Sequence, residues 1–398
     1  MKILILYETV YPNFIGGVEM RNHHLAGELA RRGHEVTLGG FCGALESDLP
    51  NLRIASLGDL GRLYNAHGKR STLQALRFAA TVASPARLDL SPFDLIETAN
   101  MPYVHLFPLA ARCARAGKPL LVSWYEHWGP YWREYVGALR APVYQTIEWL
   151  AAQLGDAVTA TSELTRGRVV AARRVGRNAA RAAVHLVPCG LDVAEVLSAG
   201  AKGSHGDGPP LIYAGRLLTH KRLELLLHAI ALLVRGGGAA LPAGPLLTIF
   251  GEGPDRPRLE GLTRELRLFG RVLFRGHVGE NAEVWRELGR ARIAVQPSVR
   301  EGFGLFPLEA MAAGLPVVYS LSPESAVGEL VRDGVEGIAV QPSDPARLAA
   351  VLARLLAEPE EERRLARQAV ARAAAYDWSE IAAGVEAICQ DLIARRSR

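Results

Sequence analysis

Cysteine is scarce in this sequence and shows no paired spacing. The four cysteines of the 398 residues are scattered, at Cys42, Cys113, Cys189 and Cys389. Disulfide frameworks and zinc sites need cysteines at close, repeated spacings, so the sequence predicts neither. We therefore expect a reducing, cytoplasmic setting for the chain.

The sequence also has no apolar run long enough to cross a bilayer. Its longest strongly apolar helical run, 223–234, contains Glu224 and His228. That run is about twelve residues long, whereas a spanning helix needs about twenty. The start, MKILILYETV, predicts a strand, because a signal peptide would have a longer apolar region and a small-residue cleavage site. We expect neither a membrane span nor export.

Several short catalytic motifs are missing as well. No two aspartates stand two positions apart, which removes the Asp-x-Asp clamp that some transferases use for a metal-bound diphosphate. The sequence predicts no metal site. It has no G-x-S-x-G elbow, no phosphate loop ending in Gly-Lys-Ser/Thr and no G-x-G-x-x-G fingerprint. These absences disfavour hydrolase, kinase and dinucleotide-binding functions.

What the sequence does contain is an alternation of short apolar strands and helices. With 49% hydrophobic and 22% charged residues it has the balance of a globular protein. Its length predicts two domains, at roughly 150 residues per domain. The alternation in both halves predicts an α/β fold with two parallel-sheet domains. The aperiodic segment AGAKGSHGDGPP predicts a linker, so we expect domains at 1–200 and 211–375, joined by 201–210.

The stretch SVREGFGLFPLEAMAAGLPVV gathers two carboxylates and a glycine turn in front of a helix. Glu301 and Glu309 in this stretch are separated by seven residues. Pro307 suits the first helical position and Gly314 suits the stop. The sequence therefore predicts a helix of about two turns over 307–313.

The Gly-Phe-Gly turn of the same stretch predicts an anion site. Glycines let backbone amides approach a ligand without a side chain between them. The amides of Gly304, Leu305 and Phe306 would then point outward from the positive end of the helix, where phosphate is commonly bound. The alternative is a solvated helix cap with two surface carboxylates.

The pattern E-G-F-G-L-x-x-x-E-A-M-A-A-G-x-P-V-V resembles the Glu-x7-Glu signature of family 4 glycosyltransferases. The resemblance implies the GT-B fold, in which two Rossmann-like domains face a central cleft and the C-terminal helix, here in 376–398, crosses back to the first domain. It also implies transfer of a sugar, with retention at the anomeric carbon, from a nucleotide diphosphate sugar. In such enzymes the residue matching Glu309 binds the ribose hydroxyls and the residue matching Glu301 holds the donor sugar. The resemblance implies no cofactor besides this co-substrate.

Two cations match the same family. Arg216 follows a predicted strand and Lys221 lies five positions later, at the start of a predicted helix. The resemblance implies that both are catalytic residues, which stabilise the charge that develops on the leaving nucleoside diphosphate. Taken alone, each would be a solvated surface cation.

The resemblance implies further contacts to the donor. Gly16-Gly17 resembles the loop by which the first domain closes on the diphosphate, and Gly276-His277-Val278 resembles a pocket where backbone groups read the nucleobase. Because backbone contacts cannot be read from side-chain identity, we prefer a UDP-sugar only slightly over a GDP-sugar. The predicted donor-binding residues are Gly16, Gly17, His277, Val278, Ser298, Phe303, Gly304, Leu305 and Glu309.

One position departs from the family. Related enzymes have a pattern like T-W-H-E-x-W-G-x-Y-W, with the histidine at the reaction centre, whereas this chain has SWYEHWGPYW, which places Tyr125 there and His127 two residues later. Side chains two apart on an extended segment point to the same side, so His127 is favoured for the role if the chain stays extended. If the chain turns earlier, Tyr125 would take the role through its hydroxyl. The third alternative is that both pack in an aromatic core.

The acceptor is not identified by the sequence and is a glycan, a lipid-linked saccharide or a small molecule. The run 166–181 has six arginines and no acidic residue. It would suit anionic lipid at the inner face of the membrane, an anionic acceptor, or simply a solvated helix face. Its basic residues are not interleaved with aromatics, so no nucleic acid partner is expected. The alternative functions are a sugar-nucleotide epimerase of the same fold and a catalytically silent nucleotide-binding or scaffold protein.

Overall fold

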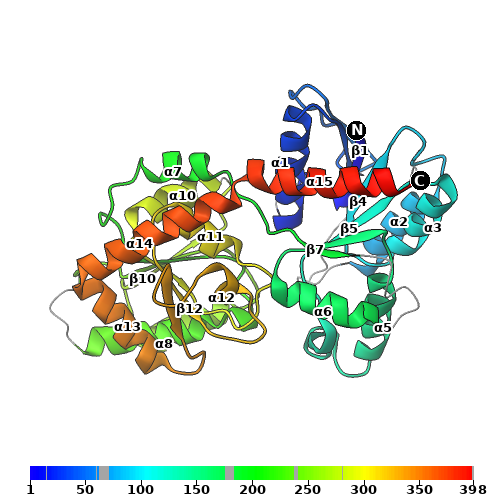
Figure 1. Ribbon diagram of the computed structural model, residues 1–398. Helices are drawn as coiled ribbons and strands as arrows, with labels where there is room; N and C mark the ends of the chain where they lie inside the picture. The colour runs from blue at the N-terminus through cyan, green and yellow to red at the C-terminus, as the bar shows by residue number, and fades with distance from the viewer. Residues whose placement is uncertain are drawn as a thin grey trace. The chain divides into compact units, whose positions relative to one another are not determined.

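The computed structural model divides the chain into two compact units (Figure 1). Unit 1 contains Met1–Gly190 and Trp378–Arg398, and unit 2 contains Leu191–Asp377. Within them the structure describes residues 1–14, 16–59, 61, 71–174, 183–236, 241–279 and 281–396. The predicted boundary at residue 200 is therefore wrong, since the division lies ten residues earlier in the chain.

The residues predicted as a linker belong to unit 2. Helix α7 (Val193–Gly200) lies so close to α10 (Asn281–Arg290) that a Cβ atom on Gly289 would meet the α7 backbone at 2.0 Å. Further along, His205 Nε2 lies 3.0 Å from Glu362 Oε1. These contacts fasten the glycine-rich segment to the second unit, which composition alone could not indicate.

Unit 1 contains a seven-stranded parallel sheet in the order β3-β2-β1-β4-β5-β6-β7. Its strands are β1 (Lys2–Thr9), β2 (Glu35–Phe41), β3 (Leu52–Ser56), β4 (Leu95–Ala99), β5 (Leu120–Trp124), β6 (Ala157–Ala160) and β7 (Val184–Leu186). Its helices are α1 (Gly17–Arg31), α2 (Thr72–Ala83), α3 (Leu106–Ala116), α4 (Trp132–Val136), α5 (Ala141–Ala152), α6 (Glu163–Arg174) and α15 (Trp378–Arg396).

The central strand β1 is buried on both faces, as parallel strands covered by helices are. Ile3 and Ile5 contribute to one hydrophobic cluster together with α1 and α15, whereas Leu4 and Leu6 contribute to another with α2, α3, α5 and α6. This alternation follows the period of two of a strand. The near-continuous apolar run at the start of the chain is therefore the centre of the unit.

The C-terminal helix α15 packs against α1, as the resemblance implied, although the helices before it belong to unit 2 (Figure 1). Trp378 begins this helix and is buried. Its ring stacks on His24 with ring centroids 5.5 Å apart. A Cβ atom on Gly190 would meet the Trp378 ring at 2.4 Å, so a glycine is needed where the two segments meet.

Unit 2 contains a six-stranded parallel sheet in the order β10-β9-β8-β11-β12-β13. Its strands are β8 (Leu211–Ala214), β9 (Leu247–Phe250), β10 (Val272–Gly276), β11 (Ile293–Gln296), β12 (Val317–Ser320) and β13 (Gly337–Val340). Its other helices are α8 (Leu223–Arg235), α9 (Arg256–Glu265), α11 (Leu305–Ala312), α12 (Val327–Leu330), α13 (Pro345–Ala357) and α14 (Pro359–Ala373).

Both sheets have the same kind of switch point, where successive connections leave in opposite directions. In unit 1 it lies between β1 and β4, and in unit 2 between β8 and β11. Open parallel sheets bind their ligands beyond the carboxyl ends of the strands at such points. The two α/β domains predicted from the sequence are thus confirmed, and each one marks a place for a ligand.

Candidate active site

Two predicted catalytic residues meet at the switch point of unit 2. Lys221 follows β8 and Glu301 follows β11, and Lys221 Nζ lies 2.6 Å from Glu301 Oε1. The two side chains are 16% and 13% exposed, so the pair keeps access to solvent. The Gln296 side-chain amide also donates to Glu301 Oε1. The carboxylate of Glu301 is therefore oriented by two side chains of the protein itself.

His220 joins the same group, although the sequence interpretation overlooked it. Its carbonyl accepts a hydrogen bond from the Val299 amide at 3.0 Å, which ties the turn after β8 to the turn after β11. Burial, followed by the charge of Lys221, lowers the pKa of His220 to about 4. Arg216 contributes to this lowering, so its exposed side chain lies within electrostatic reach. Adjacency to Lys221 was the only signal in the sequence.

The predicted helix near the glycine turn begins earlier than expected. Helix α11 starts at Leu305, so Pro307 is its third residue and not its first. The prediction of 307–313 was wrong at the start because the first amides of a helix have no intrahelical partner, and proline is tolerated anywhere among them. Gly304 precedes the helix with φ +115, a conformation that favours glycine. The amides of the first turn are thus available for an anion.

Glu309 lies on α11 with its carboxyl group in contact with Trp285 of α10. Trp285 Nε1 donates to Glu309 Oε1 at 3.2 Å. Burial raises the pKa of Glu309 to about 7, and the hydrogen bond from Trp285 works in the opposite direction. Trp285 is itself 5% exposed. Sequence reasoning missed Trp285 because 24 residues separate it from its partner.

The remaining donor-site candidates of unit 2 lie in different surroundings. Ser298 is fully buried, and its Oγ has no hydrogen-bond partner among the described residues. Phe303 packs against Tyr376, with ring centroids 5.9 Å apart. His277 is exposed and Val278 half-buried, directly after the edge strand β10. The structure thus groups Ser298 and Phe303 with the glycine turn, whereas His277 and Val278 follow a different strand.

Gly16 and Gly17 lie in unit 1, at the start of α1. Gly16 is the N-terminal cap in an extended conformation and Gly17 is the first helical residue. A Cβ atom on Gly16 would meet Glu19 Oε2 at 2.4 Å. A larger residue at this position would therefore have to displace the Glu19 carboxylate. Ile15 lies outside the described residues.

The structure separates Tyr125 from His127. Strand β5 ends at Trp124 and the chain bends at Tyr125, so the extended conformation that favoured His127 is not formed. The Tyr125 hydroxyl donates to Asn22 Oδ1 of α1 at 3.4 Å. His127 instead stacks on Trp124, with centroids 5.7 Å apart, and its Nδ1 lies 3.9 Å from Glu148 Oε2. The condition under which His127 was favoured, an extended segment beyond Trp124, is therefore not met.

Glu148 of α5 holds the loop that follows the bend. This buried carboxylate accepts hydrogen bonds from the Trp128 amide at 2.8 Å, the Gly129 amide at 2.7 Å, the Tyr103 hydroxyl at 2.9 Å and Trp132 Nε1 at 3.2 Å. The aromatic loop is therefore folded around one anion. No short motif links Glu148 to this loop, so its role could not be predicted from the sequence.

A buried charge pair, Arg21 and Glu97, holds α1 against the sheet of unit 1. Arg21 Nη1 lies 2.8 Å from Glu97 Oε1, and both side chains are 2% exposed. The Ser123 hydroxyl donates to the same Glu97 oxygen at 2.8 Å and accepts from the Thr159 hydroxyl at 2.9 Å. Arg21 also lies over the Tyr125 ring, 5.6 Å from its centroid. The network thus fixes Tyr125 against α1.

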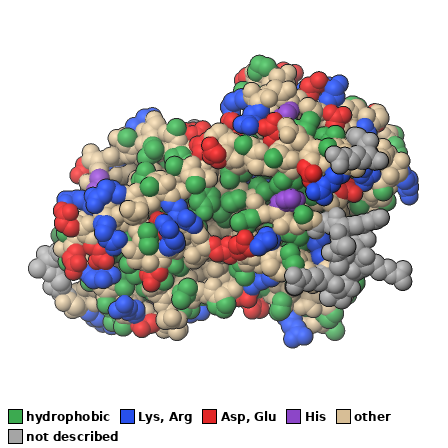
Figure 2. All heavy atoms as spheres, in the orientation of Figure 1, with side chains coloured by type: hydrophobic (Ala, Val, Ile, Leu, Met, Phe, Trp, Pro, Cys, Tyr) green, Lys and Arg blue, Asp and Glu red, His purple; other side chains and the backbone are tan. Residues whose placement is uncertain are grey.

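The basic run at 166–181 supplies less free charge than its composition suggests. Arg166 pairs with Glu163 at 2.7 Å. Arg173 is buried and donates to the carbonyl of Leu154 at 3.1 Å. Residues 175–181 lie outside the described part of the chain. On the face drawn in Figure 2, Lys and Arg side chains are interspersed with Asp and Glu, so the net charge of +5 forms no single field there.

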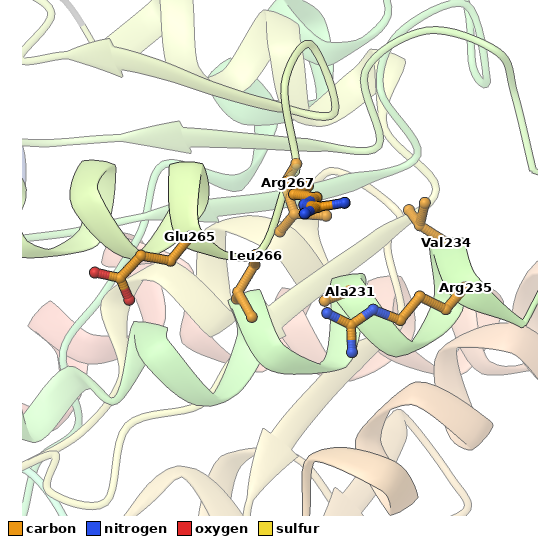
Figure 3. Close-up of a pocket in the computed structure, with 7 residues that line it drawn as sticks. Ala231, Val234, Arg235, Glu265, Leu266 and Arg267 are labelled. Carbon is orange, nitrogen blue, oxygen red and sulfur yellow. The ribbon is translucent and has the colours of Figure 1, made fainter.

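In the part of the chain that the structure describes, no helix has both the length and the apolar character needed to cross a membrane. The same residues contain no cluster of three or more His, Cys, Asp and Glu side chains that could hold a metal ion. Figure 3 shows a surface pocket between the end of α8 and the 265–268 segment. Because α8 starts beside the carboxyl end of β8 and runs back along the sheet, this pocket lies at the opposite edge from Lys221 and Glu301.

Comparisons with known proteins agree with this geometry. A family model described as "Glycosyl transferases group 1" matches residues 199–372, and one described as "Glycosyltransferase Family 4" matches residues 15–195. A D-inositol 3-phosphate glycosyltransferase of Frankia alni is 39% identical over 46% of this chain, a match that spans 45% of that protein. A glycogen synthase of Mycobacterium tuberculosis is 28% identical over 96% of this chain and 92% of its own length.

The fold is shared with solved structures over its full length. Sucrose-phosphate synthase from Thermosynechococcus elongatus has a TM-score of 0.77 at 24% identity, covering 99% of each chain. At that identity the likeness concerns the fold alone, which is the GT-B arrangement of two parallel-sheet domains. The two family models match adjacent halves of the chain, one in each unit for most of its length. The chain therefore belongs to the family 4 glycosyltransferases of the GT-B fold.

Proposed function

We propose that this glycosyltransferase moves a sugar from a nucleotide diphosphate sugar to its acceptor with retention at the anomeric carbon. The observation that carries the proposal is the 2.6 Å pair between Lys221 and Glu301 at the switch point of unit 2. Glu301 would hold the donor sugar, and Glu309 on the following helix would receive the ribose. The preorganised carboxylate supports a donor site that is formed before the substrate binds.

The leaving diphosphate would be stabilised without a metal. As the bond to the sugar breaks, negative charge develops on the phosphate oxygens, and fixed cations nearby stabilise the transition state. Lys221 and Arg216, with the first-turn amides of α11, are placed to supply this charge. Because His220 is neutral, it does not repel the positive charges of Lys221 and Arg216. Activity that survives EDTA would support this arrangement, and an absolute, specific requirement for manganese or magnesium would overturn it.

The donor base and the acceptor set the substrate range. We propose a UDP-sugar in preference to a GDP-sugar, and a glycan, lipid-linked saccharide or small molecule as acceptor held by unit 1. Tyr125 takes the reaction-centre role in this proposal, because its hydroxyl lies against Asn22 of α1 whereas His127 is packed against Trp124. A silent scaffold or an epimerase gains no support from any of these contacts.

The experiment that tests the proposal is mass spectrometry of the products formed from a panel of UDP-, GDP- and dTDP-sugars with cell extract as the source of acceptors. We expect one donor to be consumed and its sugar to appear on a new product. NMR of that product should show the same anomeric configuration as in the donor. No turnover of any donor would contradict the function, and an inverted product would contradict only the retaining mechanism.

We also propose that unit 1 contacts an anionic membrane at the cytoplasmic face. The support is an exposed apolar stripe on and before α5: Leu139 is 94% exposed, Val143 59%, Trp149 38% and Leu150 41%. Val143 and Leu150 are seven positions apart on α5, which places them on one face of the helix, and the exposed Arg133 and Arg140 lie close to Leu139 in the chain. An apolar stripe bordered by arginines suits the boundary of an anionic bilayer.

Vesicle sedimentation tests this contact. The protein should bind vesicles that contain phosphatidylglycerol more strongly than vesicles of phosphatidylcholine alone, and the double substitution Val143→Glu and Leu150→Glu should abolish the difference. Leu321→Glu is the matched control, because Leu321 is 50% exposed but lies in unit 2. Equal binding by the double variant and the control would contradict the assignment to α5.

A further inference from the structure

We infer that Trp285 is a positioning residue for the nucleotide: its indole N–H fixes the Glu309 carboxylate so that the second oxygen is presented to the ribose hydroxyls. The inference rests on the proposed function, in which Glu309 receives the ribose. It adds a residue from a separate helix, α10, that no motif contains. It also predicts that nucleotide binding is linked to the ionisation of Glu309.

The contact is directional. Trp285 Nε1 can only donate, and it donates to Glu309 Oε1 at 3.2 Å. Among the described residues it is the one side-chain partner of this carboxyl group. An ionised carboxylate has about four acceptor positions, so Oε2 and part of Oε1 remain open to hydroxyl donors. The two hydroxyls of a ribose are both able to donate, which matches a carboxylate and not a neutral acid.

The burial of the two groups differs in a way that suits a ligand site. Trp285 is 5% exposed and belongs to the hydrophobic core of unit 2, so its ring cannot move freely. Glu309 keeps partial access to solvent on the surface of α11. A rigid donor behind a partly accessible carboxylate is the arrangement expected for a group that must keep one orientation when its ligand is absent.

The linkage follows from the surroundings of the Glu309 carboxyl group. Burial raises the pKa of Glu309 to about 7, and the Trp285 hydrogen bond opposes this rise. No charged side chain of the described elements packed on α11, which are α7, α10, α12, α14, β11 and β12, contributes to this shift. Ribose hydroxyls favour the ionised form, so binding must release the proton that the free protein holds below pH 7.

The sign and size of the effect can be stated. If only the ionised form binds, the dissociation constant rises as the pH falls below the pKa of the free protein. With a pKa of about 7, UDP affinity should fall about tenfold between pH 8 and pH 6. The phosphate of UDP titrates in the same region. The probe is therefore UDP measured against 2′,3′-dideoxy-UDP, because the phosphate titration is common to both ligands and cancels in their ratio.

The test is calorimetric titration of UDP and 2′,3′-dideoxy-UDP at several pH values. The ratio of their affinities should fall about tenfold from pH 8 to pH 6 in the wild type. Trp285→Phe removes the donor that opposes protonation, so it should move the midpoint to higher pH and restore near-wild-type affinity at the alkaline end. A uniform loss of affinity at every pH would instead indicate a merely structural role and would overturn the inference.

A second measurement covers the case in which Trp285→Phe does not fold. One indole NH signal of the uniformly nitrogen-labelled wild type should titrate with a midpoint near 7, and it should stop titrating in Glu309→Gln. No such signal would contradict the inference. If neither ligand binds the wild type, the donor site itself is refuted and the inference falls with it. If both bind with a constant affinity ratio, the donor site stands and only the role of Trp285 is refuted.

Discussion

The two units organise their polar residues in opposite ways. In unit 2 the groups assigned to the donor lie on short turns and one helix start, and the Lys221–Glu301 pair keeps 16% and 13% of its surface exposed. In unit 1 the Arg21–Glu97 pair is 2% exposed and Glu148 is 1% exposed, each within a network of hydrogen bonds. The first arrangement leaves charge available to a ligand, whereas the second uses charge to hold the chain in place.

This difference predicts that accessible residues mainly affect turnover and that buried residues mainly affect stability. Removing a group from an accessible site should reduce turnover and leave stability nearly intact. Removing a group from a buried network should destabilise the unit, because the partners left behind lose their hydrogen bonds in a place that water does not reach. Substitutions in the two units therefore distinguish the two roles.

The largest effect is expected at the solvent-accessible pair of Lys221 and Glu301. Lys221→Ala and Glu301→Ala should each lower turnover by about a hundredfold or more, because a preorganised charge contact of this kind is worth several kcal/mol in the transition state. Nucleotide affinity should change much less in Glu301→Ala. Lys202→Ala is the control, since Lys202 is an exposed lysine of the same unit. Wild-type turnover in both variants would refute the site.

The next effect belongs to the buried network of the aromatic loop. Glu148→Ala leaves four donors without their acceptor, so the free energy of unfolding of unit 1 should fall by about 3 kcal/mol or more. Urea titration followed by tryptophan fluorescence reports on this unit, because most tryptophans lie in it: Trp124, Trp128, Trp132, Trp149 and Trp378. UDP affinity should be retained. A loss of UDP affinity with unchanged stability would contradict the structural role of Glu148.

A smaller effect separates Tyr125 from His127. Tyr125→Phe should lower turnover about tenfold, on the scale of one lost hydrogen bond to a charged group, and His127→Ala should lower it less. The reason is that the Tyr125 hydroxyl lies beside α1, whereas His127 is held by Trp124 and Glu148. Steady-state kinetics with saturating donor measures both. The reverse ranking would give the reaction-centre role back to His127.

The smallest effect concerns His220. Because its pKa is lowered to about 4, the imidazole is neutral at pH 7, and His220→Gln should change turnover by less than about threefold there. In the unfolded wild type the His220 imidazole takes up a proton between about pH 6.5 and 4, whereas in the folded protein it does not. Acid in this window therefore destabilises the wild type. When the pH is lowered from 7.5 to 5, the melting temperature of the wild type should therefore fall more than that of His220→Gln. If the difference between the two melting temperatures is the same at both pH values, the neutral imidazole is contradicted.

The same contrast explains how much the sequence could predict. Both parallel sheets and the C-terminal crossing followed from alternating apolar runs and the family pattern. Glu301 and Glu309 were visible because nine residues contain them both with their glycine turn. The start of α11 was misplaced by two residues because proline is compatible with more than one position of a first turn.

What the sequence did not indicate depends on long-range contacts. Arg21 and Glu97 are 76 residues apart, and Trp285 is 24 residues from Glu309. Nothing in the local pattern of either partner predicts the other. The bend at Tyr125 is likewise held by residues distant in the chain, since Asn100 Oδ1 accepts from the Tyr125 amide at 3.4 Å and the Thr161 hydroxyl donates to the Tyr125 carbonyl at 3.1 Å. The domain boundary was misjudged for the same reason, since His205 meets Glu362 on α14.

The most direct measurement of the central claim is the calorimetric affinity for UDP of the wild type and of Glu309→Ala, at pH 8 with EDTA present. Unit 2 should bind UDP without a metal, and loss of the Glu309 carboxylate should weaken binding about tenfold or more, on the scale of a charge-assisted hydrogen bond. Equal affinity of the two proteins, or binding by the wild type only after a divalent metal is added, would contradict the account.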